Sequence, residues 1–235
     1  LPGWGGSHET WRDFVKLASE YFDKVKVIDL PCFGDSPCPA IAWGVEEYAE
    51  YAHTEIEKLH FTNLALLGHS FGGQVAVKCV SEYPKIADKL ILSGPAVFRP
   101  SFSFRRFFFG LLAKFGKKLF TLPFVEKGSA FAKKLLYNKI IGSRDYVDSV
   151  GIKQEIFKKI IRQDLQHLLP KIEVSTLILW GKKDSFVPVK NGTEMLKMMP
   201  NACLHIFKKG GHGLHIHNQA EMILTIQHFL HNEQH

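Results

Sequence analysis

The 235-residue sequence has no uninterrupted apolar run that approaches the roughly 18 residues of a membrane-spanning helix. Its first residues, LPGWGG, show neither an initiator methionine nor the basic and apolar regions of a signal peptide. Internal repeats and low-complexity linkers are also absent. With 46% hydrophobic and 23% charged residues, the composition indicates a folded globular chain that can bury a substantial core.

Cysteine is scarce, and the four that occur are widely scattered: Cys32, Cys38, Cys79 and Cys203. Such sparse use is typical of reduced thiols in an intracellular protein, so we predict four free thiols and a cytoplasmic location. Cys32 and Cys38 lie in one Pro-rich loop and could pair, although their spacing does not require a disulfide.

Acidic residues are scarce in one segment. Residues 97–168 contain 15 Lys and Arg but 5 Asp and Glu, which gives this segment a net charge of +10. Because the whole chain carries +7, the remainder carries −3. The sequence therefore predicts a basic segment on a mildly acidic body.

Short apolar runs alternate with helical patterns along most of the chain. Runs bounded by Gly, Pro or Asp predict buried strands at residues 26–30, 64–67, 90–92, 176–179 and 204–207. Helical patterns lie between them, roughly at residues 8–22, 42–59, 73–82, 192–198 and 218–232. This alternation predicts an α/β fold, with a mostly parallel sheet and helices on both faces.

The alternation fails between about residues 98 and 169, where Phe-rich and Lys-rich helical patterns replace the strands. Pro95, Pro100 and Pro170 mark the ends of this block. We therefore predict an α/β core formed by residues 1–96 and 170–235, and a helical cap insertion at residues 97–169 that packs over the sheet. Most aromatic residues of the insertion are expected to form its own core, and its cations a solvated face.

One serine lies in a motif with chemical meaning. Gly68-His69-Ser70-Phe71-Gly72 follows a predicted strand and precedes a predicted helix. A sharp turn at this junction lifts the serine hydroxyl clear of the backbone, and it needs small residues on both sides. A plain Gly-rich turn is the alternative. The context favours a nucleophilic serine, which requires a base, an acid that orients the base, and donors for an oxyanion.

A suitable acid and base follow in the sequence. Asp184 lies just beyond the predicted strand at residues 176–179, and His212 lies beyond the strand at residues 204–207. In a parallel sheet these strand ends lie on one edge, and Ser70 emerges on that edge too. The order of the three residues and their placement both favour a nucleophile, an acid and a base at one site.

With these motifs, the chain resembles the α/β-hydrolase superfamily, in its esterase-like and lipase-like group with a helical cap. The resemblance covers nearly the whole chain and rests on GHSFGG, WGKKDSFVP and GGHG, in that order. It implies that Ser70 is the nucleophile and that His212 is the general base and then the general acid. Asp184 would hold the His212 imidazole in the required tautomer.

The resemblance also implies an oxyanion hole formed by the backbone amides of Phe71 and Trp4. Pro2 stands where the family usually has histidine, and Cys32 stands where it usually has glycine. We expect four apolar side chains to line the substrate pocket: Phe98, Phe102, Phe107 and Val187.

The start of the chain departs further from the family pattern, in which other strands precede the oxyanion loop. By resemblance, one of them lies between the strands that correspond to residues 26–30 and 64–67. We therefore expect that the first strands are missing at the N-terminus and that the chain is less stable than a longer one, because unpaired backbone inside a sheet is costly.

Other side chains near these motifs have alternative roles. His69 is interpreted as a structural or pocket-lining residue, and Asp35 as a weaker rival for the acid. The spacing in HGLHIH, residues 212–217, does not match common zinc sites, so no metal and no cofactor are predicted. His215 and His217 are expected to flank the final helix as partly buried residues. The other acid position used by some relatives, after the strand at residues 90–92, holds Ser93.

The sequence thus predicts a serine hydrolase that cleaves an ester or related acyl bond of a lipophilic small molecule through an acyl-enzyme. Alternatives are a C–C bond hydrolase or acyltransferase of the same fold, and a catalytically silent relative that uses its basic cap as an interaction surface. No nucleic-acid partner is predicted, and the basic cap suggests weak association with membrane surfaces. The oligomeric state is left open.

Overall fold

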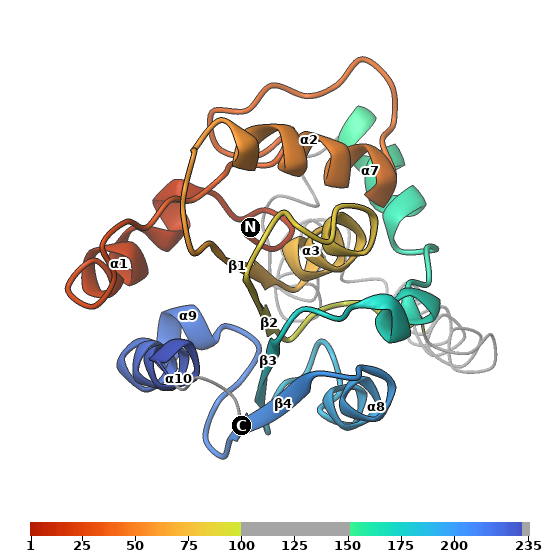
Figure 1. The fold of residues 1–235 in the computed structure, drawn as a ribbon. Helices are drawn as coiled ribbons and strands as arrows, with labels where there is room; N and C mark the ends of the chain where they lie inside the picture. Colours follow the sequence, from red (N-terminus) through yellow and green to blue (C-terminus); the bar gives the residue numbers. More distant parts are fainter. Residues whose placement is uncertain (100–150, 232–235) are drawn as a thin grey trace, which may run out of the picture.

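The computed structural model describes residues 1–99 and 151–231 (Figure 1). Within them, four parallel strands form one sheet in the order β1 (Ala65–His69), β2 (Lys89–Ser93), β3 (Thr176–Gly181) and β4 (Ala202–Phe207). The register pairs His69 with Ser93 and Gly181 with Phe207. The carboxyl ends of all four strands therefore lie on one edge, as the sequence predicted.

Helices cover both faces of the sheet (Figure 1). One face packs against α2 (Val45–Glu57), α3 (Phe71–Glu82) and α8 (Lys190–Met198), and the other against α1 (His8–Ala18), α9 (Leu214–His217) and α10 (Gln219–His231). Successive residues of β2 point to opposite faces, because Leu90 and Leu92 belong to the first hydrophobic cluster and Ile91 to the second. Strands that are buried on both faces explain the continuous apolar runs in the sequence.

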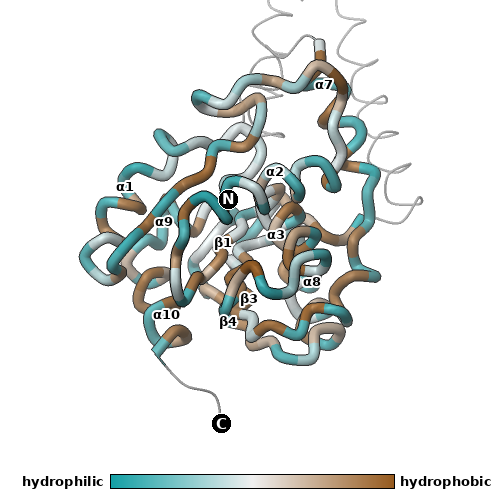
Figure 2. Tube along the Cα trace, turned by 45° about the horizontal axis from the view of Figure 1, so that its top comes forward, coloured by the Kyte–Doolittle hydropathy of each residue, from teal (hydrophilic) through white to brown (hydrophobic). Residues whose placement is uncertain are grey.

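Local sequence accounts for the start and orientation of the helices. Ser7 begins α1, where its backbone N–H donates to Thr10 Oγ1 at 2.9 Å. The N–H of Gly44, before α2, donates to the Glu47 carboxylate at 2.6 Å. Figure 2 shows hydrophilic and hydrophobic residues alternating around α1, whose buried side includes Trp11 and Phe14.

The strand predicted at residues 26–30 is wrong. Residues 24–30 form neither helix nor strand, and β1 is an edge of the sheet among the described residues. A cavity of about 600 Å³ is lined by Val25 and Val27 on one side and by Ala65 and Leu67 of β1 on the other. The apolar pattern of a strand is present, but a strand also needs a hydrogen-bonded neighbour, and the cavity separates this segment from β1.

Leu1 lies beside this cavity and bonds to the edge of β1. Its backbone nitrogen donates to the Leu67 carbonyl at 2.7 Å, and its carbonyl accepts the N–H of His69 at 3.1 Å. The expected loss of stability relative to a longer chain stays a prediction.

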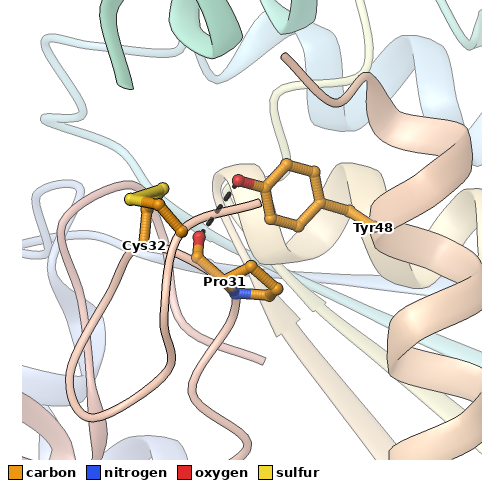
Figure 3. Close-up of a disulfide and its surroundings, with 4 residues drawn as sticks. Pro31, Cys32 and Tyr48 are labelled. Atoms are coloured by element: carbon orange, nitrogen blue, oxygen red, sulfur yellow. Dashed lines mark hydrogen bonds between the residues drawn. A yellow bond between two sulfur atoms is a disulfide. The ribbon is translucent and has the colours of Figure 1, made fainter. Parts of the chain in front are cut away.

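The cysteine prediction is wrong for one pair. Cys32 and Cys38 form a disulfide that closes the loop after residue 30, whereas Cys79 and Cys203 are free, as predicted. Figure 3 shows this loop held from the other side by the Tyr48 hydroxyl, which donates to the Pro31 carbonyl at 3.0 Å. The spacing of six residues permitted the bond, but only the turn of the loop brings the two sulfur atoms together.

Most of the predicted cap insertion lies outside the described residues. Its described end contains α7 (Ile152–Ile160) and the 3₁₀ helix η1 (Gln166–Lys171). Ile156 and Ile160 are buried in the same hydrophobic cluster as α2 and α3. The boundaries of the insertion therefore stay a prediction. Among the helices of the described residues, none is long and apolar enough to span a bilayer.

Candidate active site

Ser70 occupies a strained turn between β1 and α3. It directly follows β1, has φ 52° and ψ −111°, and is followed at once by the first residue of α3. The two glycines of the motif are required because backbone carbonyl oxygens lie where a side chain would begin. A methyl group on Gly68 would lie 2.6 Å from the Gly72 carbonyl oxygen, and one on Gly72 would collide with the carbonyls of Leu1 and Pro2. The contact at Gly68 is local to the motif, whereas that at Gly72 comes from the packing of the first residues of the chain.

Asp184 and His212 are brought together by two loops that hydrogen-bond to each other. The N–H of Lys182, just after β3, donates to the Phe207 carbonyl at the end of β4, and the N–H of Lys183 donates to the Gly210 carbonyl, each at 2.9 Å. As a result, His212 Nδ1 lies 2.7 Å from Asp184 Oδ2. The Asp184 side chain is 1% exposed and that of His212 17%. The structure thus pairs the predicted acid with the predicted base.

The second oxygen of Asp184 is held by backbone donors. The N–H groups of Phe186 and Val187 both donate to Asp184 Oδ1 at 2.8 Å. These bonds orient the carboxylate and stabilise its charge where water is excluded. A carboxylate that accepts from His212 Nδ1 favours the tautomer with the proton on Nδ1, which leaves Nε2 as a base.

His69, the residue before Ser70, packs directly against His212. The two ring centroids are 4.8 Å apart, and His69 Nδ1 donates to the Ser93 carbonyl at 2.9 Å. Burial, followed by the nearby His212 and His215, holds the pKa of His69 well below its usual value. His69 is therefore a neutral, structural neighbour of His212, which agrees with its predicted role.

The side chains of the two residues predicted to donate to the oxyanion pack against each other. The rings of Trp4 and Phe71 are 5.8 Å apart. A methyl group on Gly3 would lie 3.2 Å from Ser70 Cβ, so this loop runs against the serine. No hydrogen bond between described residues uses the backbone N–H of Trp4 or Phe71. The oxyanion role of the two amides stays a prediction. The Trp4 ring also contacts Phe33 at 4.9 Å, which links this loop to the disulfide loop.

His215 lies between the rings of Trp11 and His69, an arrangement that the sequence did not predict. Its ring stacks on Trp11 with centroids 4.0 Å apart, and it lies 4.7 Å from the His69 ring. Its Nδ1 is buried without a hydrogen-bond partner among the described residues. Burial, with smaller effects of His212, His217 and the N-terminus, lowers the pKa of His215 from 6.5 to about 4.

This pKa shift predicts acid sensitivity. The unfolded chain binds a proton at His215 near pH 6.5, whereas the folded chain does so only near pH 4, so stability is lost as the pH falls through that window. The loss from this group is about 3 kcal/mol at most. His215→Phe keeps an aromatic ring on Trp11 but cannot titrate, so its unfolding free energy should fall less between pH 7.5 and pH 4.5.

Urea unfolding at several pH values measures this effect. The same substitution at the exposed His231 serves as the control and should leave the wild-type pH dependence unchanged. An unchanged slope in His215→Phe would mean that other groups cause the acid sensitivity.

Two of the four residues predicted to line the substrate pocket lie among the described residues. Phe98 and Val187 are half-buried and pack against the first hydrophobic cluster, and Val187 also accepts a hydrogen bond from Trp180 Nε1 at 3.0 Å. Phe102 and Phe107 lie outside the described residues. Sequence reasoning overlooked Phe186, which lies 5.2 Å from His212 between ring centroids. The only sequence feature that could have indicated its proximity to the site is its position two residues after Asp184.

Asp35, the rival acid, lies at a different place. His8, Asp29 and Asp35 bring ligand atoms within 4.8 Å of one another and could in principle hold a metal ion. However, the Asp29 oxygens already accept the N–H of His8 at 2.6 Å and that of Asp35 at 3.2 Å. The Asp29 side chain also raises the pKa of His8 through a hydrogen bond. Because His8 is the first residue of α1, the Asp29 carboxylate caps the start of this helix, which accounts for the cluster without a metal ion.

Known proteins resemble this chain over most of its length. A model of the alpha/beta hydrolase family matches residues 1–223. A 2-hydroxy-6-oxononadienedioate/2-hydroxy-6-oxononatrienedioate hydrolase from a Pseudomonas species is 28% identical over 228 residues, covering 89% of this chain and 79% of its own. A 2-hydroxy-6-oxo-6-phenylhexa-2,4-dienoate hydrolase from Burkholderia cepacia is 28% identical over 170 residues, covering 67% of this chain and 57% of its own.

Solved structures share the fold. An esterase from Exiguobacterium antarcticum superposes with a TM-score of 0.74 at 22% identity, covering 99% of this chain and 90% of its own. A meta-cleavage product hydrolase from Pseudomonas fluorescens IP01 superposes with a TM-score of 0.67 at 18% identity, covering 95% and 85%. At these identities the likeness concerns the fold alone.

Proposed function

The chain belongs to the alpha/beta hydrolase family, and we propose that it is a serine hydrolase with Ser70 as nucleophile, His212 as base and Asp184 as orienting acid. The observation that carries this proposal is the 2.7 Å contact between His212 Nδ1 and Asp184 Oδ2, on the sheet edge where Ser70 emerges. The contact between the His69 and His212 rings supports it, because His69 adjoins Ser70 in the chain.

The reaction follows from these positions. His212 Nε2 takes the proton of the Ser70 hydroxyl as the oxygen attacks a carbonyl carbon of the substrate. The carbonyl oxygen becomes an oxyanion, which accepts hydrogen bonds from the amides of Trp4 and Phe71 and faces the positive end of the α3 dipole. The imidazolium, stabilised by Asp184, then protonates the leaving group, and water releases the acyl group by the same steps in reverse.

The bond that is cleaved distinguishes two candidates. Both an ester and a ketone that neighbours a cleavable C–C bond present a carbonyl carbon to Ser70 and form an oxyanion. The curated relatives above are named as hydrolases of 2-hydroxy-6-oxo dienoates, and one of them matches 89% of the chain. We therefore favour C–C bond hydrolysis, the alternative from the sequence, over ester hydrolysis, its main interpretation. Acyl transfer and a silent relative are less favoured.

A direct comparison of substrates tests this order. We expect the purified chain to cleave 2-hydroxy-6-oxo-6-phenylhexa-2,4-dienoate with a kcat/KM at least roughly tenfold above that for p-nitrophenyl acetate, because one relative is named for that substrate and another for related dienoates. Loss of dienoate absorbance and release of p-nitrophenolate measure the two rates. A reversed order, confirmed across a chain-length series of p-nitrophenyl esters, would make the protein an esterase. Turnover of neither would favour a silent relative.

The remaining sequence predictions stand as proposals. A small-molecule substrate agrees with the named relatives. Membrane association through the basic cap concerns mostly residues outside the described ones. For the cytoplasmic location, the Cys32–Cys38 disulfide counts against the prediction, because disulfides persist mainly in oxidising compartments.

A further inference from the structure

Phe186 is an exposed aromatic residue beside the candidate base. Its ring centroid is 5.2 Å from that of His212, with an angle of 36° between the ring planes, and the residue is 49% exposed. Its backbone N–H donates to Asp184 Oδ1 at 2.8 Å, so the same carboxylate that orients His212 also positions Phe186. The backbone at Phe186 is therefore fixed relative to the base, and its ring lies beside the imidazole.

The packing around His212 shows from which side a substrate reaches it. His69, which is 5% exposed, covers one side of the His212 ring at a centroid distance of 4.8 Å. Phe186 lies against it from the exposed surface and belongs to neither hydrophobic cluster of the described residues. Its ring thus contributes little to the core, and it forms part of the accessible surroundings of the base.

The chemistry decides which part of a substrate meets this ring. In a serine hydrolase the leaving group receives its proton from the histidine, so it must lie beside His212 when the bond breaks. A side chain that packs on the accessible side of His212 therefore contacts the leaving group rather than the acyl group. An aromatic ring in that position interacts best with another flat π-system, in an offset or edge-on arrangement.

We propose that Phe186 is a specificity-determining residue that binds a flat, unsaturated leaving group. This class includes the aryl alcohol of an ester and the conjugated dienoate released from a 2-hydroxy-6-oxo dienoate. The inference rests on the proposed function of Ser70, His212 and Asp184, and it adds the chemical class of the group that leaves.

Two esters with the same acyl group test the proposal, because they differ only in the leaving group. Phe186→Ala should lower kcat/KM for phenyl acetate about tenfold and change that for ethyl acetate less than about twofold. Phe186→Leu, which keeps apolar volume but no ring, should lose about threefold on phenyl acetate. The matched control is Leu224→Ala on α10, which truncates another exposed side chain, 52% exposed, and should leave both esters unchanged.

The outcomes separate this inference from the proposed function. Equal losses on both esters would mean that Phe186 only supports the Asp184 loop, and no loss on either would mean that it does not touch the leaving group. Either result overturns the inference while leaving the hydrolase proposal intact. If the wild type cleaves only the dienoate, the tenfold loss is expected there and should appear in KM. A wild type that cleaves none of these substrates overturns both.

Discussion

Replacing Ser70 by alanine is expected to abolish turnover, with kcat lowered about 10⁴-fold to 10⁶-fold, and to abolish labelling by a fluorophosphonate probe. In the proposed mechanism this hydroxyl forms the covalent bond, and the strained backbone conformation of Ser70, with φ 52°, is consistent with presenting it. Alanine removes only one oxygen atom from a half-buried position, so the fold should remain. Probe labelling on a gel and a steady-state assay measure both effects.

Ser93→Ala is the matched control. Ser93 ends β2 directly opposite His69, on the same sheet edge, and its hydroxyl is buried without a hydrogen-bond partner among the described residues. The His69 ring bonds to the Ser93 backbone carbonyl, which alanine retains. Labelling and turnover should therefore be preserved. Labelling that persists in Ser70→Ala would place the nucleophile elsewhere, and an unlabelled wild type would argue for a silent relative.

The second large effect is expected at Asp184, where asparagine should lower kcat about 10³-fold to 10⁴-fold near neutral pH. The carboxylate accepts a hydrogen bond from His212 Nδ1 at 2.7 Å, and in the proposed mechanism it balances the positive charge that His212 acquires. An asparagine of equal size can donate to Nδ1 instead, which would put the imidazole proton on Nε2 and remove the base. The same steady-state assay measures this loss, with circular dichroism as a check of folding.

Asp35→Asn supplies the comparison for this experiment. Asp35 was the rival acid in the sequence, but its carboxylate is almost fully exposed and lies near His8. We expect its turnover to stay within about twofold of the wild type. If Asp35→Asn lost as much activity as Asp184→Asn, the assignment of the acid would be wrong.

The parts of the site that sequence predicted are those governed by local rules. The turn at Ser70 needs glycine at position 68 because the Gly72 carbonyl oxygen approaches it, a contact within a five-residue stretch. The motif also places glycine at position 72, although the carbonyls that approach it belong to Leu1 and Pro2. The positions of Asp184 and His212 follow from one further rule, that parallel strands end on a common edge. The observed register of β1 with β2 and of β3 with β4 satisfies that rule.

The predictions that failed concern partners that local patterns do not name. Residues 26–30 have the apolar pattern of a strand, but within residues 1–99 and 151–231 no neighbouring strand bonds to them. Cys32 and Cys38 were compatible with free thiols and with a disulfide, and the path of the loop decided between them. The stacking of His215 on Trp11 joins residues about 200 positions apart, which no spacing rule covers.

By itself, the sequence determined the fold class, the turn at Ser70 and the order of Ser70, Asp184 and His212, because each depends mainly on residue types within one short segment or on the shared edge of a parallel sheet. Only the tertiary structure decided which carboxylate meets His212, which rings surround it, and that Phe186 lies on its accessible side. These contacts depend on how separate loops pack in three dimensions. Their distances arise from long-range packing, which a linear pattern does not encode.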